Sequence, residues 1–261
     1  MKSKMFWMKR FAFLSLLFFL FSCASRKNIV YYQDIDKMGS AERGESYEVK
    51  IQPDDLLMII VSADDAEAAL PFNLKTYSIS GNKLDVTRGQ ETVQQYLVDF
   101  DGNIEFPVLG KIKVGGLSRT ELLSLLQSKI GSYIKNPIIN LRITNFKISL
   151  QGEVNMPGTY SVASERITLI EALSMGKDLT VYGKRNNILI IRETNSKKSY
   201  NRVDITKSDF INSPFYYLAQ NDVVYVEPNK TKVNSSAVGP NTSVIISAVS
   251  ILVSLSVLIF K

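Results

Sequence analysis

The longest apolar runs of this 261-residue chain lie at its two ends. Residues 11–21 form the first run, and they follow a basic segment, residues 2–10, that contains no acidic residue. A membrane-crossing helix needs about 20 apolar residues, whereas the core of a secretory leader needs only about 7–15. The pattern therefore predicts a secretory leader over residues 1–22.

The leader ends in Leu20-Phe21-Ser22-Cys23, which resembles the bacterial lipobox. The resemblance implies a diacylglycerol on the sulfur of Cys23, cleavage before it and acylation, for example by palmitate, of the new amino terminus. Several acyl chains make such an anchor effectively permanent, because each buried CH₂ contributes about 0.8 kcal/mol. Ala24 and Ser25 follow where an Asp would retain the protein at the inner membrane, which favours the outer membrane. A leader that merely contains a cysteine is the alternative.

The second apolar run, residues 244–260, is uncharged and is interrupted only by serines. An 18-residue helix from Ser243 reaches about 27 Å, which suffices for a thin hydrocarbon layer. We therefore expect an amphipathic transmembrane helix over residues 243–261. Four serines share one face within an arc of about 60°. This serine stripe consists of Ser243, Ser247, Ser250 and Ser254.

A serine stripe suits a helix that lines a wet pore or packs against copies of itself, because small polar residues permit close helix contact. A lone lipid-facing anchor has no need of such a stripe. The stripe alone does not distinguish pore lining from helix contact. A C-terminal anchor whose serines only help it dimerise is the simpler alternative.

Between the ends, the pattern indicates an α+β organisation. Residues 23–45 are polar and predict an acylated tether. Residues 47–51 alternate and residues 56–61 are apolar, which predicts strand, turn and strand. Residues 64–95 carry polar patches and indicate an insertion. Asp101-Gly102 lies between two alternating segments, which is a strong signal for a hairpin.

Two helices are predicted by their first turns. Ser118 and Glu121 form a capping box before apolar residues at helical spacing, which predicts a helix over residues 119–131. Thr168 and Glu171 form a second capping box, and Gly176 is placed to end a short helix. Each helix is expected to pack on a sheet of alternating strands.

Several motifs resemble the polysaccharide export family. They are Pro53-Asp54-Asp55-Leu56, the segment 99–110 around Asp101-Gly102, and Gly115-Gly116-Leu117-Ser118. Family members usually have glycine at the position of Asp54. Residues 150–160 and 218–226 resemble the opening and closing of the soluble-ligand-binding β-grasp domain that follows the export domain in that family. Only one β-grasp copy is recognisable.

The resemblance divides the chain into segments. We expect an export domain with a small mixed sheet over residues 46–145, a β-grasp domain over 146–228 and a linker over 229–242. The resemblance also implies an oligomeric ring, commonly octameric, that exports capsular polysaccharide or exopolysaccharide across the outer membrane. The implied partners are membrane lipid, the polysaccharide and an inner-membrane copolymerase with a tyrosine kinase. A monomeric periplasmic glycan-binding lipoprotein without a pore is the alternative function.

Charge and composition exclude several other functions. Four positive charges lie before Cys23, and removing them from the formal charge of +6 leaves +2. No cluster of Lys and Arg interleaved with aromatic residues follows, so we expect no nucleic-acid partner. Histidine is absent and Cys23 is the single cysteine, which removes the usual ligands of zinc sites and the usual catalytic triads. We expect neither a metal nor a cofactor.

An enzymatic function is not expected either. The pairs Asp54/Asp55 and Asp64/Asp65 could nominally supply the two carboxylates of a glycosidase. Adjacent residues on a strand point to opposite faces, so neither pair forms a site by itself. We interpret these residues as turn caps and surface charges. No phosphate-binding loop of the type that hydrolyses nucleotides occurs in the chain.

Overall fold

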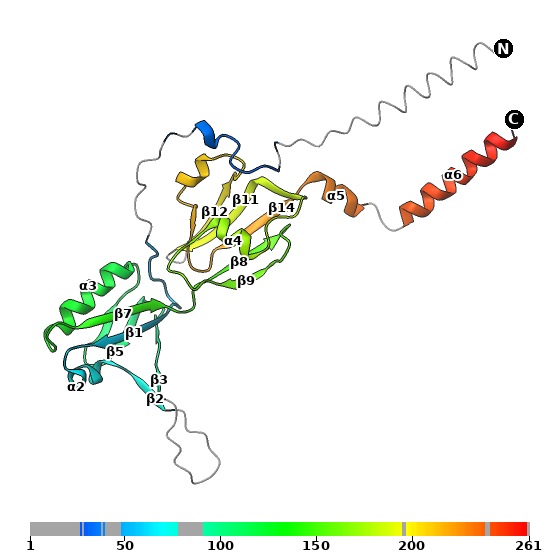
Figure 1. Ribbon diagram of the computed structural model, residues 1–261. Helices are drawn as coiled ribbons and strands as arrows, with labels where there is room; N and C mark the ends of the chain where they lie inside the picture. The colour runs from blue at the N-terminus through cyan, green and yellow to red at the C-terminus, as the bar shows by residue number, and fades with distance from the viewer. Residues whose placement is uncertain are drawn as a thin grey trace, which may run out of the picture.

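The fold is of the mixed α and β class (Figure 1). It contains two hydrophobic cores. The computed structural model describes residues 27, 29–37, 39, 48–77, 91–194, 197–237 and 241–259. One core gathers buried residues between Ile51 and Leu141, and the other gathers residues between Phe146 and Val226. We call these units the first and the second domain.

The first domain is built on a three-stranded antiparallel sheet in the order β4-β1-β7. The strands are β1 (Leu56–Ser62), β4 (Tyr96–Leu97) and β7 (Ile138–Ile143). Alternate residues of β1 are buried, because neighbouring side chains of a strand point to opposite faces. The predicted apolar strand is thus confirmed in β1.

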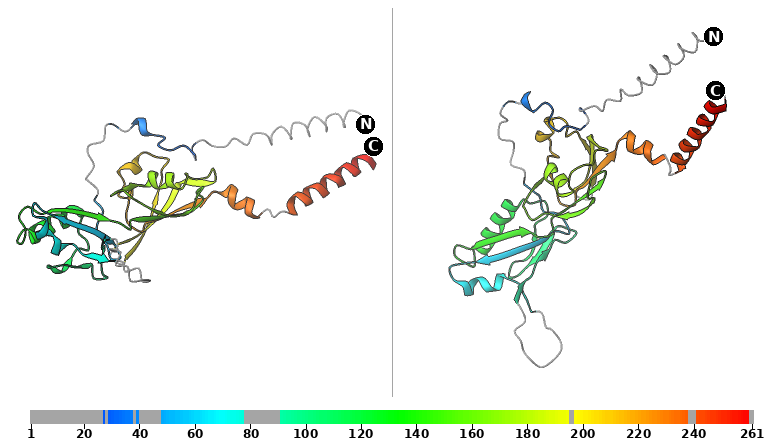
Figure 2. Two further views of the ribbon diagram at one scale, coloured as in Figure 1. Left: turned by 60° about the horizontal axis from the view of Figure 1, so that its bottom comes forward. Right: turned by 45° about the vertical axis from the view of Figure 1, so that its right-hand side comes forward.

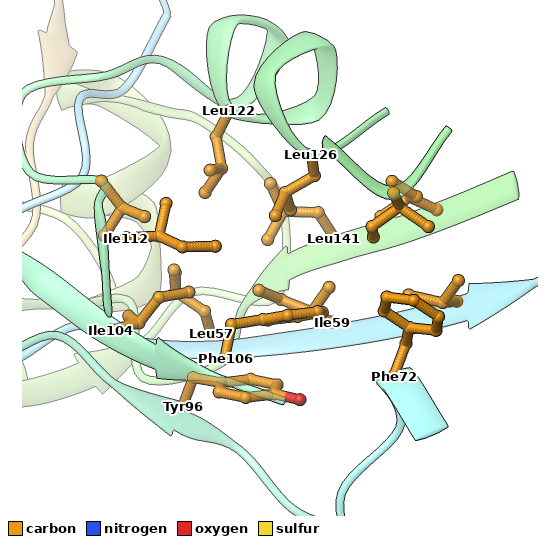
Figure 3. Packing of buried hydrophobic residues seen from close by; sticks show 14 of the residues in the cluster. Leu57, Ile59, Phe72, Tyr96, Ile104, Phe106, Ile112, Leu122, Leu126 and Leu141 are labelled. Atoms are coloured by element: carbon orange, nitrogen blue, oxygen red, sulfur yellow. The ribbon is translucent and has the colours of Figure 1, made fainter. Parts of the chain in front are cut away.

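Helix α3 (Arg119–Ile130) covers this sheet and confirms the helix predicted over residues 119–131. The capping box forms as expected, with the Ser118 side chain bound to the Glu121 amide and the Glu121 side chain to the Ser118 amide. Leu122 and Leu126 point from α3 toward Leu141 and the sheet (Figure 3). These leucines are fully buried, which fixes the helix on the sheet.

Two strand predictions for the first domain are wrong. Of residues 47–51, the described part forms only an isolated bridge between Lys50 and Ser118. The second wrong prediction is the hairpin around Asp101-Gly102. Gly102 does lie in a tight turn, but the strand after it, β5 (Asn103–Phe106), pairs with β6 (Gly110–Lys113) and not with the segment before the turn. The backbone of Val98 is instead bonded to Asp54 and Asp55, so the segment before the turn is already paired elsewhere.

The segment predicted as an insertion, residues 64–95, is partly ordered in short elements. They are α2 (Ala66–Ala69), the 3₁₀ helix η3 (Leu70–Phe72), and the paired strands β2 (Lys75–Tyr77) and β3 (Glu91–Val93). Phe72 is buried in the first core and stacks edge-on against Tyr133 at 5.8 Å. The start of the insertion therefore belongs to the packed domain.

The second domain contains a five-stranded mixed sheet in the order β12-β11-β14-β8-β9. Its first and last strands, β8 and β14, lie side by side and parallel, and the other pairs are antiparallel. The strands are β8 (Lys147–Gly152), β9 (Gly158–Ser161), β11 (Gly183–Thr194), β12 (Lys197–Val203) and β14 (Val223–Pro228). The segment 218–226, which resembles the closing of the β-grasp domain, contains a turn followed by the start of β14.

Short elements complete the second domain. Helix α4 (Leu169–Met175) has the predicted capping box of Thr168 and Glu171 and ends at Gly176. Strands β10 (Ile167–Thr168) and β13 (Tyr217–Leu218) form a two-stranded ribbon, and η4 (Asp209–Asn212) follows β12. Buried side chains of α4, including Leu169 and Leu173, join the second core.

Two helices follow β14 and extend from the second domain, away from the first domain in both views of Figure 2. They are α5 (Lys230–Ala237) and α6 (Asn241–Ile259), so much of the expected linker 229–242 is helical. No helix of the described ranges is long and apolar enough to cross a membrane. The transmembrane assignment of residues 243–261 therefore finds no support in the structure.

Candidate functional site

Residues 29–37, which we call the strap, lie against the second domain. The Gln33 amide donates to the Thr206 carbonyl at 2.8 Å, and the Tyr32 amide donates to the Ile205 carbonyl at 3.3 Å. The strap ends in a turn of 3₁₀ helix, η2 (Ile35–Lys37). This docking is absent from the sequence prediction, which treats the segment as part of a polar tether.

Three contacts of the Tyr31 and Tyr32 side chains hold the strap on the second domain. Tyr31 Oη donates to Asp178 Oδ1 at 2.5 Å, and burial and the Asp178 carboxylate raise the pKa of Tyr31. The Arg185 guanidinium lies over the Tyr31 ring at 5.5 Å. Tyr32 stacks on Phe210 with ring centroids 5.4 Å apart. The aromatic pair Tyr31-Tyr32 is the signal in the sequence that indicates this docking.

Asp34 closes the strap. Its Oδ1 accepts from the Ser208 amide at 2.7 Å and from the Ser208 hydroxyl at 2.9 Å. These bonds favour the ionised carboxylate and lower the pKa of Asp34. The amino-terminal segment is therefore attached to the second domain and not to the first domain that follows it in sequence.

The carboxyl-terminal exit is attached to the same domain. The Asn229 amide donates to the Tyr182 carbonyl at 2.7 Å, and Asn229 Oδ1 accepts from the Lys232 amide in the first turn of α5. The Lys232 ammonium lies 3.8 Å from a Glu153 carboxylate oxygen and over the Tyr182 ring. The direction of α5 is thus set by contacts with the second domain.

The predicted serine stripe falls on α6. Ser250 Oγ donates to the Ile246 carbonyl at 2.8 Å, and Ser254 Oγ donates to the Ser250 carbonyl at 2.9 Å. These hydroxyls are satisfied within the helix, which makes them compatible with an apolar environment. The side chain of Ser243 lies outside the described residues, as do Cys23 and the leader.

The apolar side chains of α6 are largely exposed, as Leu258 illustrates with 78% of its surface accessible. A continuous apolar surface of this kind marks a site of interaction with membrane or protein. The structure therefore brings the strap and the exposed helix to one domain, but it does not test the role of the four serines.

Polar side chains bond the two domains where they meet. Asn145 Oδ1 accepts from the Leu56 amide at 2.9 Å, and Asn145 Nδ2 donates to the Asp54 carbonyl at 2.8 Å. Gln220 extends from the loop before β14, donates to the Asn145 carbonyl and accepts from the Lys147 amide. Buried backbone groups of this connection are thereby satisfied.

The loop that carries Gln220 is fixed by Asp222. Arg192 Nε donates to both oxygens of the Asp222 carboxylate, and Arg192 Nη2 donates to one of them. The carboxylate also accepts a hydrogen bond from the Ala219 amide. Burial raises the pKa of Asp222, and the Arg192 guanidinium opposes that shift. The ion pair thus holds the loop that contacts the connection between the domains.

The carboxylate pairs considered for glycoside hydrolysis have structural roles. Asp65 caps α2 by accepting from the Glu67 and Ala68 amides. Asp54 has a φ of 68°, in the left-handed region that explains the usual glycine of the family at this position. Asp55 is fully buried and accepts from the Gln52 amide at 2.9 Å. The interpretation as a turn cap is confirmed for Asp65.

Known proteins resemble this chain over the first domain and beyond it. Residues 43–144 match the family described as polysaccharide biosynthesis/export protein. The chain is 30% identical over 202 residues to the EPS I polysaccharide export outer membrane protein EpsA of Ralstonia solanacearum, with 74% of this chain and 52% of that relative covered. It is 32% identical over 149 residues to the protein of the same name from Ralstonia nicotianae, with 55% of this chain and 38% of that relative covered.

The chain thus spans about half the length, or less, of the curated relatives it matches. The family and both relatives are named for export and not for catalysis, which agrees with the expectation of a non-enzymatic protein. The resemblance inferred from the Pro53-Asp54-Asp55-Leu56 and Asp101-Gly102 motifs is confirmed. Residues 43–144 are thus similar to the polysaccharide biosynthesis/export family, and the similarity to its export proteins extends beyond them.

Proposed function

We propose that this protein is the subunit of an oligomeric outer-membrane channel that exports capsular polysaccharide or exopolysaccharide from the periplasm. The observation that carries the proposal is that the strap and the start of α5 are both held on the second domain. Only seven residues lie between Cys23 and Tyr31, and the eight residue-to-residue steps limit the distance between them to about 29 Å. A lipid on Cys23 would therefore hold the second domain close to the membrane that α6 engages.

The proposed lipid anchor is acylated Cys23 at the outer membrane, with both domains in the periplasm. The family assignment and the names of the relatives support export at that membrane. The parallel pair β8 and β14 at the centre of the second sheet supports the proposal that this domain is the β-grasp domain. An inner-membrane copolymerase with its kinase is the proposed partner, because the sequence contains no phosphate-binding loop of the nucleotide-hydrolysing type.

For α6 we propose contact with membrane and with copies of itself through the serine stripe. The exposed apolar side chains of the helix and the internally bonded hydroxyls of Ser250 and Ser254 support this arrangement. A ring of subunits, octameric in the family, would place the stripe at the pore or at the contact between neighbouring helices.

The test is the mass of the detergent-extracted protein, measured together with surface polysaccharide in cells. We expect a ring for the parent chain, and loss of the ring and of export when residues 241–261 are deleted. Replacing Ser247, Ser250 and Ser254 together by leucine should impair assembly, whereas Ser256→Leu, on the other side of the helix, is the matched control. A monomeric parent protein, or normal export by the deletion variant, would reject the channel.

A further inference from the structure

A cleft of about 430 Å³ opens between the two domains, apart from the strap and α6. Its walls come from both domains, with Val49 and Ile143 on the first and Phe146 on the second. These side chains belong to or pack against the second core, so the apolar part of the cleft rests on a packed surface. Clefts that combine an apolar wall with a few polar groups are the usual form of a ligand site.

The acidic side chains of the cleft are already engaged. Glu48 Oε1 accepts from the Thr120 hydroxyl at 3.0 Å. Glu165 Oε1 lies 3.1 Å from Arg119 Nε and joins the second domain to the first. Each carboxylate therefore has a donor of its own.

Two basic side chains of the cleft have no such partner. Arg142 extends from β7 and Arg166 from the segment before β10, and both are exposed. Neither lies within ion-pair distance of a carboxylate of the described residues. Hydrogen bonds from Thr168 lower the pKa of the Glu171 carboxylate, and the charge of Arg166 acts on it and lowers its pKa further. Arg166 also lies over the Tyr217 ring at 5.1 Å. With three arginines against two glutamates, the cleft carries a net positive charge.

We propose that this cleft binds an acidic glycan, with Arg142 and Arg166 receiving the carboxylates of its sugar units. A guanidinium offers a planar pair of donors that matches a carboxylate. The apolar wall suits the CH face of a sugar ring, and the hydroxyls of Thr120 and Ser164 can still accept hydrogen bonds from sugar hydroxyls. The inference rests on the proposed export function, which supplies the glycan as the class of ligand.

The experiment compares three hexamers on the purified full-length protein in detergent: oligogalacturonate, neutral maltohexaose and hexaglutamate. We expect oligogalacturonate to bind about tenfold or more tightly than maltohexaose, and Arg142→Gln or Arg166→Gln to weaken that binding by about 3–10-fold. Arg142→Glu should weaken it further. Lys129→Gln, which removes an exposed cation of α3 away from the cleft, is the control and should change binding less than twofold.

Equal affinity for the acidic and neutral hexamers would overturn the proposal, as would equal effects of the cleft and control variants. Tighter binding of hexaglutamate would assign the cleft to an acidic protein segment and also reject the glycan. The two proposals can fail separately. If deletion of residues 241–261 abolishes export but the protein shows no preference for the acidic hexamer, the channel proposal stands and only the glycan site in the cleft is rejected.

Discussion

Asp55 is a buried carboxylate beside the connection between the two domains. Its Oδ2 accepts from the Gln52 amide, but Oδ1 has no hydrogen-bond partner among the described residues. Burial raises the pKa of Asp55 to about 6 from 3.8, although the Gln52 amide and the nearby Gln220 side chain oppose the shift. Compared with the unfolded chain, the folded protein therefore keeps this residue protonated to a higher pH, up to about pH 6.

We expect Asp55→Asn to stabilise the protein above pH 6. As pH rises from about 4 to about 6, the unfolded chain releases this proton before the folded protein does, so the parent loses stability across that window. The asparagine variant lacks this loss. Its free energy of unfolding should exceed that of the parent by roughly 1–3 kcal/mol at pH 7.5, and the two should differ little at pH 4. Urea unfolding of the detergent-solubilised chain at both pH values measures the effect.

The exposed residue Asp64 provides the matched control, because Asp64→Asn alters a carboxylate that faces solvent. Its unfolding curves should follow those of the parent at both pH values. If the free energy of unfolding of Asp55→Asn declined between pH 4 and pH 6 as that of the parent does, a group other than Asp55 would cause the decline.

At the scale of elements, a small set of contacts holds the strap on the second domain. Asp34 supplies two of them through Ser208, and the strap backbone supplies bonds to residues 205 and 206. Hydrogen bonds to a charged group are stronger than those between neutral groups. Loss of the Asp34 carboxylate should therefore release the strap without unfolding the domain beneath it.

We expect Asp34→Ala to increase the hydrogen-exchange rate of the Tyr32 and Gln33 amides by about tenfold or more. Asp36→Ala is the control, because Asp36 is exposed and has no hydrogen bond or ion pair in the strap as described. Exchange measured by mass spectrometry on both variants decides the matter. Unchanged protection in Asp34→Ala would mean that the aromatic contacts alone hold the strap.

At the scale of the whole molecule, the strap and α5, which lie toward opposite ends of the described chain, both contact the second domain. Contacts of Tyr31 and Asp34 fix the strap, and contacts of Asn229 and Lys232 fix α5. In the proposed function each end has its own membrane attachment. Removing one attachment should then leave the protein bound, and removing both should release it.

The corresponding experiment exchanges residues 1–23 for a cleavable leader that leaves no cysteine, deletes residues 241–261, or does both. We expect the single changes to leave the protein in the membrane fraction and the double change to move it to the soluble periplasmic fraction. Release by either single change would contradict two independent attachments. The folded state of the released protein is checked by protease resistance of the two domains.

Local signals determined much of what the structure contains. The capping boxes at Ser118 and Thr168 fixed where α3 and α4 begin, because side-chain and backbone partners lie within four residues of each other. The apolar run at residues 56–61 predicted the strand β1, and the order of the motifs indicated the resemblance to the export family. The leader, Cys23 and the serine stripe also follow from sequence, as predictions that the structure leaves open.

Only the tertiary structure decided which segments lie together. The strap docks on the second domain, α5 begins on that same domain, and the arginines of the cleft come from segments on both sides of the connection. The ladder of β5 with β6 forms in place of the predicted hairpin because the backbone of Val98 is bonded to Asp54 and Asp55, the residues just before β1. Such outcomes depend on competition between distant partners, which neither residue type nor spacing along the chain records.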